Sequence, residues 1–354
     1  MSLHHDLSIV SEARRIADEL LANRQHVPLR KAMDLSTPAS FDLAVARMAM
    51  ALRKQTEASD RDAVQAAVAV LDVDWRATSS GERSRLVEQA LVEAGRRTAT
   101  VPRAIETVIA DNANDLVSST RNDLRHRQGL TIAADFNALD RRIVHHLVSS
   151  ETNFVRDEYG RRQAALGLRA REVVAAGLEA GLGREDITRD LARVATSTLS
   201  TRSPFYWEVV AGSFIGRGRS YAQLSAFAEA GIERYRIESV LDERTTPVCR
   251  FLHGKVFSVG SGLRTFERVE ANPSALKDIT PWIREGRNPE TGQRELHVNR
   301  AGERLPVAEV LRSGVSVKDD EGEFRATRGD RELADLGCSF PPLHALCRSS
   351  VTVP

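Results

Sequence analysis

The stretch YAQLSAFAEAGIERYRIESVL, residues 221–241, contains the point at which the chain changes character. Before Gly231 the apolar residues recur with the period of an amphipathic helix, which the Ser203–Pro204 pair begins. After Gly231 polar and apolar residues alternate as far as Leu241, which is typical of a β-strand. The sequence therefore predicts a helical region that ends near residue 232 and a mixed region after it. The apolar face of the last helix is expected to contain Tyr206, Val210, Phe214, Tyr221 and Leu224.

The residues before this stretch predict one helix after another. Prolines, glycines and capping side chains mark the breaks between the helices. The loop at 77–81, for example, ends in Ser79 and Ser80, either of which can cap the helix that follows. The other expected helices cover residues 8–22, 38–71, 103–127, 133–180, 184–192 and 203–231.

The residues after 232 predict a small domain of strands and loops. Strands are expected at 235–241 and 255–259, with another short strand around His297 and Val298. A turn at 319–322 predicts a hairpin that pairs residues 315–317 with residues 324–327. The rest of 260–336 is polar and rich in turn residues, which indicates loops. We therefore predict an α+β protein. Its domains are a helical N-terminal region, 1–180, and a C-terminal domain, 181–354, which is helical to about 232 and mixed over 233–354.

Composition limits the class of protein. A length of 354 residues indicates two domains, and a hydrophobic content of 42% is enough for sizeable cores. No apolar run approaches the roughly 20 residues of a membrane span, and residues 1–6 do not begin like a secretion signal. The net charge of +1 provides no chain-wide attraction to nucleic acid. Arg202, Arg217 and Arg219 are interpreted as a solvated face rather than a phosphate site.

Two short motifs bring together the residue types that bind zinc. Cys249 precedes His253 by four residues, and His344 precedes Cys347 by three. Two thiolates and two imidazoles suit a tetrahedral zinc ion, which would join the two ends of a loop-rich domain. The plainer interpretation is a pair of buried cysteines with two hydrogen-bonded histidines. The odd number of cysteines argues against a disulfide framework and for reduced thiols.

The same residues allow a catalytic interpretation. Cys249 or Cys347 would be the nucleophile of a thiol hydrolase, with His344 or His253 as its base and Asp242 as the candidate orienting group. No residue pattern marks an oxyanion hole. Cys338 has no partner at an informative spacing and is expected to be structural.

The motif residues also carry a resemblance. The sequence Asp242-Glu243-Arg244-Thr245, then Pro247-x-Cys249-Arg250 and Gly254-Lys255-Val256-Phe257, resembles the head-morphogenesis domain of tailed phages, the Mu-F-like family of minor head proteins. The ending Pro341-Pro342-x-His344-x-x-Cys347-Arg348-Ser349 is similar to that family's ending. The likeness covers about residues 180–354. The matching motif positions are Asp242, Arg244, Thr245, Cys249, Gly254, Pro342, His344, Cys347 and Arg348.

The resemblance implies a structural function in head assembly, without a catalytic step. The protein is expected in the virion head, and in the host cytoplasm during assembly, of a tailed phage or prophage. Expected partners are the portal protein and the major capsid or scaffolding protein, with packaged DNA as a further partner. The family commonly has aspartate where this chain has His253, so the resemblance implies an alternative zinc ligand set in which Asp242 replaces His253. The rival hypotheses are a phage-encoded effector enzyme that uses the Cys/His cluster and a DNA-contacting protein of the head interior.

Overall fold

The structure is a computed structural model, and it describes residues 33–200 and 204–354. The chain divides into two compact units, and each unit is made of segments that are separated in the sequence. The first unit contains the described residues up to Met48, together with 112–144 and 208–354, and the second contains 49–111 and 145–207. The domain boundary predicted near residue 180 therefore falls inside the second unit, because single long helices contribute residues to both units. The helix predicted over 8–22 lies outside the described residues.

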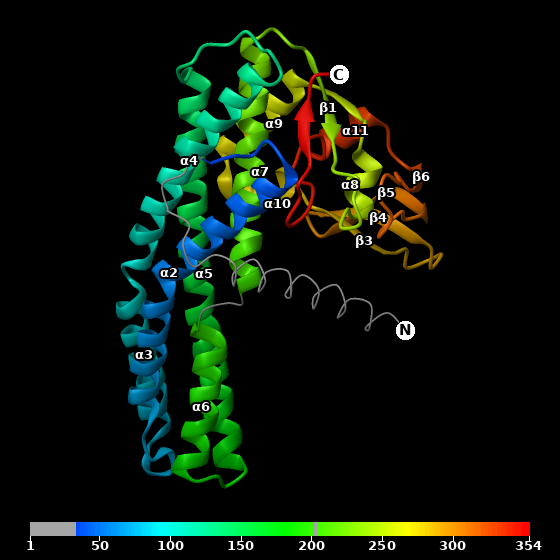
Figure 1. Ribbon diagram of the computed structural model, residues 1–354. Helices are drawn as coiled ribbons and strands as arrows, with labels where there is room; N and C mark the ends of the chain where they lie inside the picture. Colours follow the sequence, from blue (N-terminus) through cyan, green and yellow to red (C-terminus); the bar gives the residue numbers. More distant parts are fainter. Residues whose placement is uncertain (1–32, 201–203) are drawn as a thin grey trace. The chain divides into compact units, whose positions relative to one another are not determined.

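The second unit is a bundle of helices around an apolar core (Figure 1). Small residues such as Ala63, Ala67, Ala90 and Ala94 are fully or almost fully buried there, so the helices can approach closely. The buried Trp75 donates its indole N–H to the carbonyl of Leu71, 3.1 Å away. The helices that contribute to the bundle are α2 (Pro38–Leu71), α3 (Ser80–Thr98), α4 (Val101–His126), α5 (Ala138–Glu179) and α6 (Arg184–Leu199), with the short 3-10 helix η1 (Trp75–Ala77).

These bounds confirm the predicted run of helices and correct two of its ends. Helix α5 begins at Ala138 rather than at 133, where Asn137 and Asp140 exchange side-chain to backbone hydrogen bonds across its first turn. Helix α6 continues to Leu199 instead of ending at 192. Its later residues Ala195 and Leu199 are buried in the bundle core, and this packing extends the helix beyond the segment that looked amphipathic.

The start of α3 offers a test of local sequence signals. Ser79 accepts a hydrogen bond from the backbone N–H of Glu82 at 3.3 Å, and the Glu82 carboxylate accepts one from the N–H of Ser79 at 2.7 Å. This capping box satisfies two backbone donors at the helix end. We expect Ser79→Ala to lower the free energy of unfolding of the second unit by about 1 kcal/mol in urea denaturation. Ser80→Ala, one residue later and exposed, is the matched control, and an equal loss in both variants would contradict the assignment.

Helix α7 (Pro204–Glu229) lies at the centre of the first unit. The predicted helix is confirmed, but its expected amphipathic character is wrong, because every residue from Val210 to Phe227 is buried. Neighbours pack against several sides of it, with Phe266 and Phe340 against Tyr221 on one side and the Phe41 ring 4.6 Å from Arg219 on another. Arg217 and Arg219 are therefore buried rather than solvated, and Arg202 lies outside the described residues. A helix surrounded by neighbours needs no polar face.

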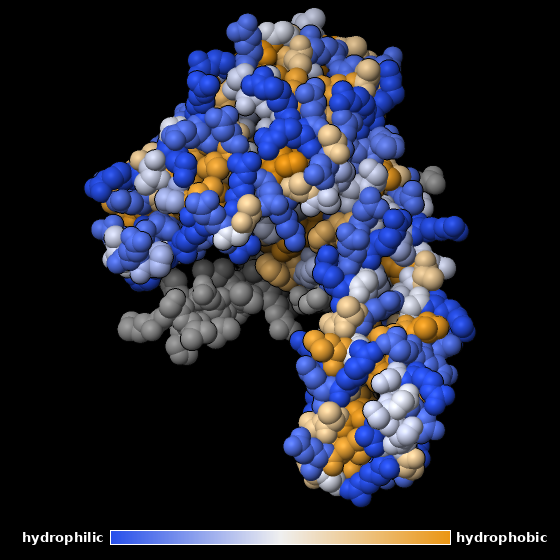
Figure 2. Space-filling view, turned by 180° about the vertical axis from the view of Figure 1, so that it is seen from behind, coloured by the Kyte–Doolittle hydropathy of each residue, from blue (hydrophilic) through white to orange (hydrophobic). Residues whose placement is uncertain are grey.

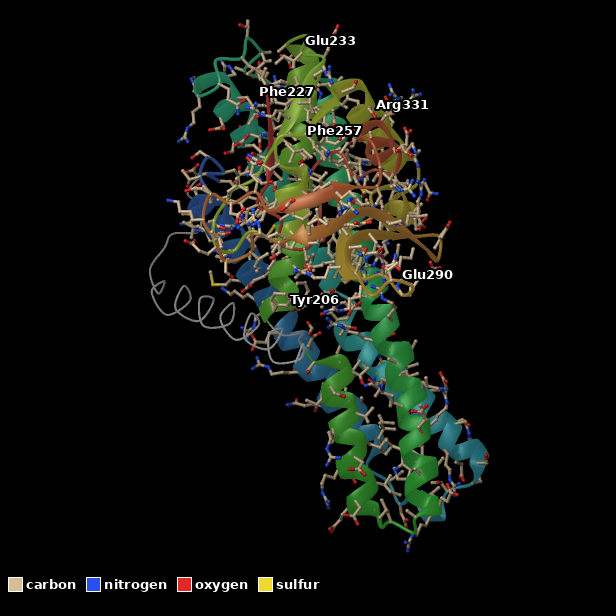
Figure 3. The ribbon with its side chains drawn as sticks, turned by 90° about the vertical axis from the view of Figure 1, so that its right-hand side faces the viewer. Tyr206, Phe227, Glu233, Phe257, Glu290 and Arg331 are labelled. Atoms are coloured by element: carbon tan, nitrogen blue, oxygen red, sulfur yellow. The ribbon has the colours of Figure 1, made fainter. Side chains whose placement is uncertain are left out.

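The first unit contains a three-stranded antiparallel sheet with the strand order β2-β1-β7. Its strands are β1 (Arg234–Glu238), β2 (Val256–Ser258) and β7 (Ser350–Thr352). Ile237 pairs with Val351 and Tyr235 pairs with Phe257. Phe227 of α7 and Phe257 of β2, labelled in Figure 3, are both buried. The strands predicted at 235–241 and 255–259 are confirmed in shortened form, and β7 adds the end of the chain beside β1.

A second sheet, ordered β3-β4-β5-β6, is antiparallel throughout (Figure 1). The predicted strand at His297 and Val298 is confirmed as part of β4. The predicted hairpin is wrong: residues 324–326 pair with β5, not with 315–317. Ser316 and Asp319 have φ values of +67° and +57°, a left-handed backbone that no strand can contain. The strands are β3 (Ile283–Arg287), β4 (Arg294–Arg300), β5 (Glu303–Arg312) and β6 (Glu323–Ala326).

Several short helices occupy segments that were predicted as loops. Helix α9 buries Val259, Phe266 and Val269 on one face, although polar residues separate them in the sequence. The mixture of helices and two small sheets confirms the predicted α+β class. The short helices are α8 (Pro247–Leu252), α9 (Val259–Ala271), η2 (Pro273–Ala275), α10 (Leu276–Ile279) and α11 (Asp330–Asp335).

Over the part of the chain that the structure describes, every helix is too short or too polar to cross a bilayer. The face seen in Figure 2 is mostly hydrophilic, with hydrophobic residues in separate patches.

Candidate metal centre

Cys249 lies in the first turn of α8. Thr246 caps this helix, since its hydroxyl accepts a hydrogen bond from the N–H of Cys249 at 3.4 Å, and Pro247 occupies the first helical position. The thiol is 5% exposed. The Ser239 hydroxyl lies 2.9 Å from both the Cys249 carbonyl and the Ser349 hydroxyl, so α8 is tied to the end of the chain.

His344 and Cys347 lie in the loop that leads into β7. Buried Arg219 of α7 holds this loop by donating to the carbonyls of Arg348 and Ser349 at 2.9 and 2.5 Å. The glycines of α7 give the loop room: a β-carbon on Gly216 would lie 3.4 Å from Pro342 Cβ, and one on Gly212 would lie 3.1 Å from the Leu346 side chain. The pairing of β7 with β1 then sets the loop against α8.

The three donor atoms meet in one cluster. Cys249 Sγ lies 3.0 Å from His344 Nε2 and 3.7 Å from Cys347 Sγ, and all three atoms lie within 4.8 Å of one another. Two sulfurs bound to one tetrahedral zinc ion at about 2.3 Å each are about 3.8 Å apart, so the sulfur separation matches a shared ion and is far too long for a disulfide. Cys249, His344 and Cys347 therefore form a cluster that can hold a metal ion.

The imidazole of His344 is oriented for ligation. Its Nδ1 lies against the backbone carbonyl of Ala345, which can only accept, so Nδ1 carries the proton. The lone pair of Nε2 consequently points toward Cys249 Sγ and the Thr246 hydroxyl, 3.0 Å from each. A hydrogen bond on the outer nitrogen is the usual way in which proteins fix the tautomer of a metal-binding histidine.

The two thiols differ in their environments. The hydrogen bond from Cys347 is the largest influence on Cys249 and lowers the pKa of its thiol, while burial opposes this effect. Burial raises the pKa of the Cys347 thiol well above its usual range. Arg219 lies near Cys347, and burial lowers the pKa of its guanidinium to about 10. A bound divalent cation would displace the thiol protons, because thiolates are the binding form.

His253 and Asp242 lie outside this cluster, so the predicted ligand sets are brought together only in part. His253 follows α8, and its Nδ1 accepts a hydrogen bond from the N–H of Ser239 at 3.1 Å. Asp242 Oδ1 accepts from Arg348 at 2.6 Å, from Thr245 at 2.9 Å and from the N–H of Arg244 at 3.0 Å. Asp242 therefore joins the two motif segments as an ion pair with Arg348 rather than as a member of the cluster.

Two other motif residues have unusual backbone conformations, and a third forms an ion pair. Gly254 has a φ of +77°, and Pro342 follows a cis peptide bond. Arg244 pairs with Asp42 of α2 at 2.9 Å. Sequence reasoning missed Thr246, Ser239, Ser349 and Arg219. The Thr-Pro pair at 246–247 is a helix-start signal that could have revealed α8, whereas nothing local marks the contacts of the two serines and the arginine.

The Asp242–Arg348 pair predicts a pH effect. Burial alone would raise the pKa of Asp242, but hydrogen bonds from Arg348 and Thr245 outweigh it and lower the pKa to about 2. A carboxylate whose pKa is lowered by folding stabilises the fold at pH values above its pKa in the unfolded chain, which is about 4. This contribution disappears as the pH falls toward about 2. We expect thermal melts in a chelator to show a smaller loss of stability over this interval for Asp242→Asn than for the wild-type chain. Equal pH slopes would contradict the pair.

The chain matches no protein-family model, no curated protein and no solved structure. The family resemblance therefore depends on the motif residues alone.

Proposed function

We propose that this chain is a structural protein of a tailed-phage head that acts in head assembly at or near the portal vertex, and that zinc bound to Cys249, His344 and Cys347 stabilises its first unit. The observation that carries the proposal is the meeting of the two motif segments. Cys249 and Cys347 are 98 residues apart in sequence, yet their sulfurs are in contact inside the fold. Arg348 of one segment also pairs with Asp242 of the other.

The donor set supports zinc in particular. Two cysteines and one histidine combine sulfur and imidazole ligands, both of which zinc binds in proteins. When bound, the ion would neutralise two thiolates and cross-link α8 to the loop before β7. That cross-link matters because β7 is only three residues long. A short terminal strand contributes little pairing energy of its own.

The surroundings of the cluster support a structural function. The charged motif side chains mostly bond to parts of the fold: buried Arg250, for example, donates to the carbonyls of Asp242 and Val317 at 2.7 and 2.9 Å. Such bonds hold the loops in place, so these charged groups already have hydrogen-bond partners within the fold. The portal protein and the major capsid or scaffolding protein are the proposed partners.

Mass spectrometry of nuclease-treated, density-purified particles from the source strain tests the assembly function. We expect the chain at low copy number beside the portal and major capsid proteins. Particles that form without the chain would contradict a function as a head component. Salt-sensitive retention of the purified chain on DNA would instead favour contact with packaged DNA. Elemental analysis of the purified chain tests the metal, with about one zinc per chain as the expected result.

One observation favours a second candidate, a thiol enzyme. Cys249 Sγ and His344 Nε2 are 3.0 Å apart, and the thiol pKa is lowered, as in a nucleophile–base pair. The outer nitrogen of His344, however, bonds to the carbonyl of the next residue and not to a carboxylate. Iodoacetamide labelling distinguishes the two functions: a structural site predicts protection of Cys249 until zinc is removed, and a nucleophile predicts rapid labelling of the chain as isolated.

A further inference from the structure

A small cavity lies beside the metal cluster. It has a volume of about 20 Å³, and Cys249 and His344 line it, whereas Cys347 does not. Two of the three residues of the cluster therefore border the cavity. A site needs only about 10–15 Å³ to hold one water molecule. The cavity is therefore large enough to hold at least one water molecule.

The cavity wall contains no further protein ligand of the usual kinds. Its other charged side chains, Arg244 and Arg348, are both cations. Among the described residues, no other Cys, His, Asp or Glu joins the three-atom group. Asp242 Oδ1 is occupied by Arg348, Thr245 and the N–H of Arg244. Thr246 also lines the cavity, and its hydroxyl lies 3.0 Å from His344 Nε2.

We infer that the metal takes its fourth ligand from solution, as a water molecule or a small monodentate anion held in this cavity. The inference rests on the proposed metal centre and specifies its coordination. Three protein ligands leave a tetrahedral ion one open position, as in catalytic zinc sites, whereas four protein ligands close the usual structural site. The Thr246 hydroxyl supplies a hydrogen-bond partner for this ligand.

Cobalt substitution tests the inference in the full chain. Co²⁺ in place of zinc reports its coordination through visible absorption, and azide is the probe for an open position. We expect sulfur-to-cobalt charge transfer on metal binding, followed by a saturable shift of the d–d bands as azide is added. Cys338→Ser is the matched control, because Cys338 lies outside the cluster, and both responses are expected to persist in it.

A second variant closes the open position. Thr246→Cys places a sulfur where the hydroxyl now contacts His344, so this chain should gain charge-transfer intensity and lose the azide shift. Cobalt binding without any azide response in the wild-type chain would overturn the inference alone, since the fourth ligand would then come from protein. A wild-type chain that shows no charge transfer with cobalt would overturn the metal centre itself, and the inference with it.

Discussion

Cys347→Ser is expected to remove the metal-dependent part of the stability of the first unit. Cys347 is fully buried and in contact with Cys249, so no other described thiol can replace it in the cluster. A metal that binds only the folded state contributes about 4 kcal/mol when its free concentration exceeds its Kd about a thousandfold. For a unit of this size we expect a melting temperature about 10 °C lower than that of the zinc-loaded wild-type chain.

The measurement is a pair of thermal melts, one in zinc and one in a chelator. The wild-type chain should show a large difference between the two melts, and Cys347→Ser should show almost none. Cys338→Ser is the matched control: Cys338 is also buried, but burial raises the pKa of its thiol to about 12 and its sulfur lies 3.9 Å from the carbonyl of Pro281. That variant should keep the chelator effect. A chelator effect of wild-type size in Cys347→Ser would refute the structural zinc site.

Gly337→Ala is expected to cost more than about 3 kcal/mol of folding free energy. Gly337 follows α11 with a φ of +81°, and its N–H donates to the carbonyl of Ala334 at 2.9 Å. A β-carbon there would lie 1.8 Å from the carbonyl oxygen of Ile279. Both atoms in this clash belong to, or are fixed by, backbone, so no side chain can rotate away. The variant must shift either the end of α11 or the turn after α10.

Gly254→Ala separates the clash from the cost of the backbone angle. Gly254 has a similar φ of +77°, but a β-carbon there would meet nothing within 4 Å. We expect this control to lose only about 1 kcal/mol, the usual cost of a left-handed alanine. Urea denaturation of both variants gives the comparison through their midpoints. Similar midpoints for the two would show that the backbone around Gly337 relaxes freely.

Several signals that are contained within a few residues led to correct predictions. One of the two serines expected to cap α3, Ser79, is its N-cap, and Pro38 lies in the first turn of α2. The pairing of Cys and His types within 249–253 and 344–347 identified the region of the candidate metal centre. Errors appeared where a segment depends on distant partners. The apolar residues of α7 have the spacing of a helix, but the sequence alone does not show that the helix is buried on all sides from Val210 to Phe227.

The sequence by itself determined the α+β class, the starts of most of the long helices and the residue types of the candidate metal centre, because each depends on contacts between residues a few positions apart. Only the tertiary structure decided which histidine joins the cluster. His344 points its Nε2 at Cys249, while His253, four residues from Cys249, bonds to the Ser239 backbone instead. Closeness in sequence to Cys249 does not determine the direction in which a histidine ring points. The backbone after α8 and the approach of the β7 loop set it, and both depend on packing between segments about a hundred residues apart.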